Sequence, residues 1–288
     1  MSWPVIVLAL AVVALILSAF SKAKQARARK AAEQAAAEKK RRQQEEARRK
    51  IEEEKQLQEQ WEERAAAACD AKEKAIEEVL AAYPEARKYR LAERQDEVTS
   101  ELLTITEFTP ISKMRYVAFD LETTGLSSGD DEIIEIGAAR VVDGEIVEEF
   151  QQLVDPGRPI PAADSSVNHI TDAMVQGQPK IYEVLPAFLA FVGNDALAAH
   201  NARFDAGFLN QACIRNRFRA PGRYFDTMSL ARYWPDSPNK KLGSLIAAAG
   251  IENDEAHRAL GDARAVAGLI AATNKLRSNK SHKKSATA

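Results

Sequence analysis

The stretch "AFDLETTGL" (residues 118–126) places an aspartate and a glutamate two positions apart at the end of an apolar run. The surrounding segment, residues 114–122, has the β-branched and aromatic residues typical of a β-strand, and Gly125 ends it. Because strand side chains alternate, Asp120 and Glu122 share one face. Two carboxylates side by side repel each other, and burying them unpaired is costly. Either the strand ends in solvated acids, or the pair binds a divalent cation together with further acids.

The composition predicts one or two domains with a sizeable core, since 45% of the 288 residues are hydrophobic. Charge is unevenly spread: the net charge is −2 overall, +8 over residues 22–50 and −7 over residues 111–272. An acidic globular part does not exclude a nucleic-acid partner if its acids cluster around metals. Cys69 and Cys213 lie in unrelated contexts and are interpreted as reduced thiols, which excludes a disulfide framework and a zinc site.

Residues 3–20 form an uncharged run of 18 residues, long enough at about 1.5 Å per residue to cross a bilayer core. Only Met1 and Ser2 precede the run, and the nearest positive charges follow it, whereas a signal peptide usually carries them in front. We therefore expect an uncleaved, single-pass anchor in the inner (cytoplasmic) membrane. By the positive-inside rule, the rest of the chain would lie in the cytoplasm. A cleaved signal peptide is the alternative.

Residues 21–82 lack glycine and proline and consist mostly of strong helix formers, which predicts a long solvated helix. A faint apolar seam favours a weak coiled coil, with self-association or a protein partner through residues 21–104. Disorder at its Ala/Arg-rich start is the alternative. Pro84 should end this helix. A second helix is expected over about residues 85–104, and a linker over residues 108–113.

The character of the sequence changes at residue 111. Residues 132–156 predict two strands joined by a turn at Asp143 and Gly144. Residues 196–201 form a short apolar run that predicts a buried strand. Amphipathic or apolar patterns predict helices over residues 179–194, 202–218, 242–251 and 258–276. Strands followed by helices mixed with further strands indicate an α/β domain with a mixed sheet.

Three motifs supply the missing acids: "FDLETTG" (residues 119–125), "HNARFD" (residues 200–205) and "HRALGD" (residues 257–262). In order, spacing and residue type they resemble the three motifs of the DEDDh family of 3′→5′ exonucleases. This family includes the proofreading (epsilon) subunit of bacterial DNA polymerase III and ribonuclease T. The similarity runs from about residue 115 to residue 272, just over half of the chain. Each motif alone is weak, but three in register are specific.

The resemblance implies a ribonuclease-H-like fold, with a mixed five-stranded sheet flanked by helices, and two divalent metal ions, Mg²⁺ or Mn²⁺. Asp120, Glu122 and Asp262 would hold the first ion, and Asp120 would bridge to the second with help from Asp205. Phosphodiester hydrolysis needs a deprotonated water and a stabilised leaving oxyanion, which two such metals provide. His257 would accept the proton of the water, because imidazole titrates near neutral pH.

The resemblance also implies contacts to the terminal nucleotide. The candidate substrate-binding residues are Thr123, Thr124, Gly125, His200, Asn201 and Phe204. For Phe204, a place in the hydrophobic core is an equal alternative. The family often has His-Gly-Ile-Thr where this chain has Asn168, His169, Ile170 and Thr171. That departure puts the family's base-wedge contact in doubt.

The sequence thus predicts a membrane-anchored, metal-dependent 3′→5′ exonuclease that acts on single-stranded nucleic acid, with DNA favoured, and releases nucleoside 5′-monophosphates. Alternatives are an exoribonuclease in RNA decay, a non-catalytic binding or scaffold module on the same fold, and a membrane-tethered coiled-coil organiser. The expected parts are an anchor (1–20), a charged helical stalk and linker (21–110), an exonuclease domain (111–272) and a basic tail (273–288).

Overall fold

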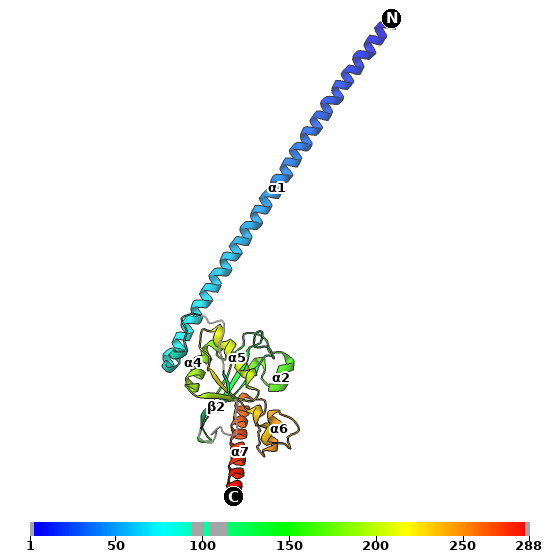
Figure 1. Cartoon of the computed structure of the whole chain (residues 1–288). Coiled ribbons are helices and arrows are strands. Elements are labelled where there is room, and N and C mark those ends of the chain that lie inside the picture. The colour runs from blue at the N-terminus through cyan, green and yellow to red at the C-terminus, as the bar shows by residue number, and fades with distance from the viewer. Residues whose placement is uncertain (1–2, 94–100, 104–113, 286–288) are drawn as a thin grey trace. The chain divides into compact units, whose positions relative to one another are not determined.

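The structure is a computed structural model that describes residues 3–93, 101–103 and 114–285 (Figure 1). The side chains of residues 3–14, 31–32, 35–36, 102–103 and 280–285 lie outside this description, as does the expected linker at 108–113. The chain divides into two compact units, Met1–Asp70 and Ala71–Ala288. The second unit contains the sheet and all of the predicted motifs.

Helix α1 (Trp3–Ala82) fulfils the prediction of one long helix, and it ends two residues before Pro84. Seven ion pairs between residues four positions apart lie along its exposed surface, between Arg29 and Glu78. Each such pair contributes only a few tenths of a kcal/mol. Large apolar side chains such as Leu57 and Trp61 are exposed. The described residues therefore show a solvated helix, and the expected coiled coil is not supported.

The predicted membrane anchor and inner-membrane localisation need correction. Among the residues that the structure describes, no helix is long and apolar enough to cross a membrane. This finding contradicts the predicted localisation.

The sheet is mixed, as expected, but it has six strands in the order β1-β6-β5-β2-β3-β4. The five longer strands are β2 (Arg115–Thr123), β3 (Ile133–Val142), β4 (Glu145–Leu153), β5 (Ala196–Ala199) and β6 (Arg223–Asp226). Strands β2, β3 and β4 pair antiparallel, whereas β5 and β6 run parallel to β2. Asp143 and Gly144 both have positive φ in the tight turn between β3 and β4, as a type I′ hairpin turn requires.

The predicted helix over residues 85–104 is wrong where the structure describes this segment, and residues 94–100 lie outside the described residues. The 3₁₀ helix η1 (Pro84–Tyr89) occupies its start, and the short strand β1 (Glu101–Leu103) adds to the sheet beside β6 at its end. Ala86 and Tyr89 are buried, so packing against the domain overrides the helical pattern of the isolated segment.

Helices cover both faces of the sheet (Figure 1). The other helices are α2 (Ala162–Asn168), α3 (Asp172–Val175), α4 (Ile181–Val192), α5 (Ala202–Arg215), η3 (Thr227–Tyr233), α6 (Leu242–Ala248) and α7 (Ala259–Ser285). One hydrophobic cluster joins Val117 and Phe119 of β2 to α4 and α5. A second joins Tyr116 and Ala118 to α6 and α7. By strand alternation, Asp120 belongs to the face that α7 covers.

Candidate metal centre and active site

Strand β2 presents its two acids near its carboxyl end. Asp120 lies opposite Gly137 of β3, and Glu122 lies opposite Glu135. The register then shifts by a bulge between Glu122 and Thr123, which is a common way to terminate pairing beside an active site. The side-chain alternation predicted from the sequence therefore holds for both acids.

Helix α7 brings the third acid to this face. Asp262 lies in its first turn. A Cβ on Gly137 would lie 2.1 Å from the Ala259 carbonyl carbon and from the Leu260 nitrogen, so the helix start sits directly on the strand backbone. Asp120, Glu122 and Asp262 each offer a carboxylate oxygen, and these three oxygens lie within 4.8 Å of one another. The structure brings together three acids that are up to 142 positions apart in sequence.

Asp205, the fourth predicted acid, approaches the same strand from α5. It is buried, and its Oδ1 accepts a hydrogen bond from the Leu121 backbone N–H at 3.1 Å. That bond ties Asp205 to the residue between the two acids of β2. Asp205 is not part of the three-oxygen group, but its charge raises the pKa of Asp120.

The carboxyl groups of the site disfavour one another's ionisation. Burial, followed by the charges of Asp205 and Glu122, raises the pKa of Asp120 well above its ordinary value. Burial and the charge of Asp262 raise the pKa of Glu122 to about 8. Burial raises the pKa of Asp205 to about 8 as well, and burial also raises the pKa of Asp262. Like charges gathered in a partly desolvated space are stabilised by a bound cation.

This donor set fits divalent metal ions. Clustered carboxylate oxygens are hard ligands, which suit Mg²⁺ or Mn²⁺ better than zinc. The described residues of the cluster include no cysteine or histidine ligand. Two divalent ions, Mg²⁺ or Mn²⁺, are the cofactors that the acidic cluster and the family described below define.

His257 lies in the loop before α7, exposed and with a left-handed φ of 61°. Its backbone hydrogen bond and its charge both act to lower the pKa of Asp262, against the larger effect of burial. His257 therefore lies beside a carboxylate of the cluster, with its imidazole open to solvent. The geometry suits a group that meets an incoming substrate.

The side chains of the residues that follow Glu122 form hydrogen bonds within the loop after β2. The hydroxyl of Thr123 donates to the Gly125 carbonyl at 2.6 Å. The hydroxyl of Thr124 accepts from the Glu132 N–H at 3.0 Å. A Cβ on Gly125 would lie 2.3 Å from the Asp131 carboxylate. The two threonine side chains thus shape the loop, and both are buried.

His200, Asn201 and Phe204 lie at the junction of β5 and α5. The ring of His200 bonds Thr227 Oγ1 at 3.0 Å through Nδ1 and the Lys240 carbonyl at 2.7 Å through Nε2. Burial lowers the pKa of His200. Asn201 is exposed with a left-handed φ of 64°. Phe204 is partly buried and packs against Phe208 with tilted rings whose centroids are 4.9 Å apart. His200 therefore connects the start of η3 to the loop before α6, and Phe204 belongs in part to the core.

Two polar residues near the acids escaped the sequence reasoning. The amide of Asn253 donates to Asp262 Oδ1 at 2.8 Å. Asn168 is buried, and its side chain hydrogen-bonds Glu122, which acts to lower the pKa of that acid. The sequence pattern marks Asn168 only as a departure from the family. His169, which replaces the usual glycine, holds a left-handed φ of 60° and is exposed.

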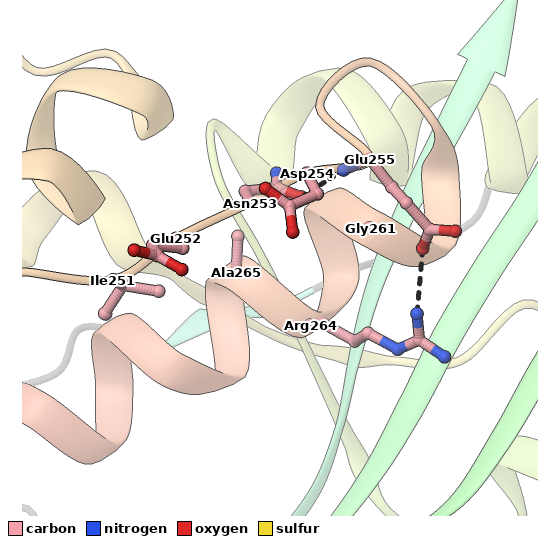
Figure 2. A pocket seen from close by; sticks show the side chains of 8 residues that line it. All are labelled: Ile251, Glu252, Asn253, Asp254, Glu255, Gly261, Arg264 and Ala265. Atoms are coloured by element: carbon pink, nitrogen blue, oxygen red, sulfur yellow. Dashed lines mark hydrogen bonds and ion pairs between the residues drawn. The ribbon is translucent and has the colours of Figure 1, made fainter.

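Two hollows adjoin the loop that carries His257. One, of about 580 Å³, lies between this loop and α6 and is lined in part by Lys241, His257 and Asp262. Its volume lies in the range of small-ligand pockets. The other, of about 400 Å³, is shown in Figure 2, where Arg264 of α7 forms an ion pair with Glu255 of the loop.

A mixed sheet with flanking helices and acids gathered on one face defines the class of ribonuclease-H-like exonucleases. The model of the Exonuclease family (RNase_T) matches residues 117–270, more than half of the chain. The chain therefore belongs to this family, which confirms the predicted resemblance. The match also confirms the predicted enzyme class at the level of the domain, which is an exonuclease-family domain, a class that hydrolyses phosphodiester bonds.

Similarity to individual proteins is confined to this domain. PolC-type DNA polymerase III of Clostridium perfringens is 47% identical over 156 residues, which is 54% of this chain and 11% of that protein. The PolC-type DNA polymerase III of Bacillus subtilis is 40% identical over 158 residues, with the same coverage. The chain thus spans about a ninth of the length of these relatives.

Solved structures show the same fold. The E. coli exonuclease I in complex with a dT13 oligonucleotide matches with a TM-score of 0.51 at 17% identity, covering 59% of this chain and 43% of that one. At this identity the match supports the fold alone.

Proposed function

We propose that this chain is a metal-dependent 3′→5′ exonuclease that removes nucleotides from single-stranded DNA and releases nucleoside 5′-monophosphates. The observation that carries the proposal is the group of three carboxylate oxygens within 4.8 Å of one another. Family membership supports the reaction class, and the DNA polymerase relatives favour DNA over RNA.

We assign the site residues by their positions. Asp120, Glu122 and Asp262 would hold the metal ions, and Asp120 would be shared between the two. Asp205 would take part from α5 while its bond to the Leu121 N–H fixes its position. When bound, the two ions supply Lewis acidity, which lowers the pKa of the attacking water and stabilises the leaving oxyanion.

His257 would act as the general base. Its exposed imidazole is placed beside Asp262, where it can accept a proton from the attacking water. The terminal nucleotide would lie along the loop of Thr123, Thr124 and Gly125. The hollow of about 580 Å³ beside His257 has room for a nucleotide, and Lys241 in its lining suits a phosphate.

The remaining candidates, His200, Asn201 and Phe204, would border the substrate path at the start of α5. Because the ring of His200 is committed to Thr227 and to the Lys240 carbonyl, its role would be to hold the loop before α6. The exposed amide of Asn201 and the partly exposed ring of Phe204 would meet the sugar and phosphate directly.

The test is a side-by-side digest of matched single-stranded DNA and RNA, labelled at the 5′ end, with Mg²⁺ or Mn²⁺. We expect a ladder that shortens from the 3′ end, mononucleoside 5′-phosphates as products, faster cleavage of DNA, and no reaction in EDTA. Asp120→Asn should be inactive. Faster cleavage of RNA would reassign the substrate, and activity that persists in EDTA would contradict the metal-dependent reaction.

A further inference from the structure

Glu135 is a buried acid that the proposed chemistry does not use. It lies in the apolar strand β3, directly opposite Glu122, and is fully shielded from solvent. An uncompensated charge at a fully buried position is strongly destabilising. The hydrogen-bond partners of Glu135 therefore indicate the role of its carboxylate.

All of the partners of Glu135 are hydrogen-bond donors, and three of these bonds come from the start of α7. Arg258 donates to both of its oxygens, from Nε at 3.0 Å and from Nη2 at 2.6 Å. The Ala259 backbone N–H donates to Oε2 at 3.1 Å, and Gln151 donates to Oε1 at 2.9 Å. The paired, two-point geometry of Arg258 fixes orientation as well as distance.

Arg258 directly follows His257 in the chain. Since the φ of His257 is left-handed, a conformation that costs energy for a residue with a side chain, the neighbouring contacts must hold it in place. Arg258 supplies one such contact through Glu135, on the strand that pairs with the strand of Asp120 and Glu122. The loop that carries the imidazole of His257 is thereby fixed to the same sheet that carries Asp120 and Glu122.

We propose that Glu135, acting through Arg258, is a positioning residue that holds His257 over the acidic cluster. This inference rests on the proposed role of His257 as general base. Glu135 itself does not touch substrate in this account. Its carboxylate anchors a guanidinium, and the guanidinium anchors the loop.

The experiment is a double-mutant cycle in the full chain, with single-stranded DNA and saturating Mn²⁺. We expect Arg258→Gln to lower kcat by about 10- to 100-fold, the usual scale for a misplaced catalytic group, with little change in KM. His257→Ala should lose about 10²- to 10⁴-fold. Because the contact between Arg258 and Glu135 acts on catalysis only through His257, Arg258→Gln should cause no further loss of kcat in the His257→Ala background.

Two further variants sharpen the result. Arg258→Lys keeps the charge but loses the two-point bond, so we expect an intermediate kcat. Glu135→Gln should show the same dependence on His257 as Arg258→Gln, and if it does not fold, the Arg258 cycle alone decides. Arg115→Gln is the control for loss of an arginine–carboxylate ion pair in the same sheet. Arg115 at the start of β2 donates from Nε to both oxygens of Asp195, and its loss should leave kcat unchanged.

The outcomes separate the two claims. Independent, multiplicative losses from Arg258→Gln and His257→Ala would overturn the positioning role, as would Arg258→Gln with the wild-type kcat. If His257→Ala itself keeps the wild-type rate, the proposed function of His257 fails instead.

Discussion

At the scale of single residues, the site is a concentration of like charge that the fold tolerates. Four acids converge, and burial is the largest cause of the raised pKa of each. Such an arrangement stabilises the protein poorly by itself. It becomes favourable when cations replace protons, which couples metal binding to pH.

The first prediction follows from this linkage. A carboxyl group whose pKa is raised in the folded state contributes stability at low pH and loses it as pH rises through the folded pKa. For Glu122 and Asp205 this window runs from their ordinary pKa values, 4.5 and 3.8, to the folded values of about 8. Without metal, the Tm should therefore fall between pH 6 and pH 8.5. Saturating Mg²⁺ should raise the Tm more at pH 8.5 than at pH 6.

Thermal melts at both pH values, with EDTA or Mg²⁺, check this prediction. Asp120→Asn should show a smaller fall of Tm with pH and a smaller effect of Mg²⁺. An equal Mg²⁺ shift at both pH values would contradict the linkage. The acids with lowered pKa, such as Glu149 and Asp155, titrate below this window and do not disturb the comparison.

The second prediction concerns Gly137, which has no space for a side chain. A Cβ there would lie 2.1 Å from the backbone of α7, so Gly137→Ala must push the helix away from the sheet. Asp262 would move away from Asp120 and Glu122. We expect weaker Mn²⁺ binding and a loss of activity of about 100-fold or more. Calorimetry of Mn²⁺ binding and the kcat on single-stranded DNA measure both effects.

Gly222→Ala is the control for this substitution. A Cβ at Gly222 meets no atom within 4 Å, so the variant should behave as wild type. If Gly137→Ala binds Mn²⁺ as tightly as Gly222→Ala does, the close contact between β3 and α7 is not what assembles the site.

The sequence predicted the acids because their types and spacing are tied to the chemistry. It did not predict a role for Glu135 or Asn253, because their roles depend on hydrogen bonds that the sequence does not reveal. Glu135 binds Arg258, which is remote in the sequence, and Asn253 reaches Asp262 from a loop. A signal was available for Glu135, since it interrupts an apolar strand in the same way as Asp120 does. For the close contact between Gly137 and α7, the sequence offers no indication other than the glycine itself.

At the scale of elements, the end of α1 belongs to the catalytic unit. Ile76 and Leu80 are fully buried in the cluster formed with α4 and α5. Glu73 forms ion pairs with Arg90 and Arg217, and Arg90 donates from Nη1 to the Asn216 carbonyl at 2.7 Å. We propose that the exonuclease domain begins at Ala71, where the two units divide, instead of at residue 111.

The third prediction tests this boundary on α1. Leu80→Ala should lower the free energy of unfolding by about 2–5 kcal/mol, because it removes a fully buried side chain. Leu57→Ala on the same helix should have almost no effect, since Leu57 is 66% exposed. Urea denaturation of the full chain measures both variants.

Truncation gives an independent reading. Residues 71–288 should melt at nearly the temperature of the full chain, whereas residues 93–288 should be strongly destabilised. Equal melting temperatures for these two fragments would show that residues 71–92 are not part of the domain.

The elements were predictable wherever local pattern and tertiary contacts agree. The β3–β4 hairpin and helices α4 to α7 follow from alternation, turn residues and apolar periodicity. The structure after Pro84 was not predictable in this way. Its described residues form a 3₁₀ helix and a short edge strand, and no local pattern in the sequence indicates either element. Strand β6 is only four residues long, too short for a clear period.

At the scale of the whole molecule, the chain joins a charged helix to a family domain. Its relatives carry this domain within proteins about nine times the length of the matched part. The apolar start suggested a membrane anchor, a prediction that the described residues contradict. The composition of residues 21–82 predicts the long helix, but it does not determine what the helix contacts.

The central claim is that the acidic cluster binds the metal ions that drive hydrolysis. The most direct measurement is anomalous X-ray diffraction from crystals of the protein grown with Mn²⁺. We predict two anomalous peaks at Asp120, Glu122 and Asp262, and their loss in Asp120→Asn. Crystals of active protein with no peak at these carboxylates, or with Mn²⁺ only at the acidic loop of Glu252, Asp254 and Glu255, would contradict the account.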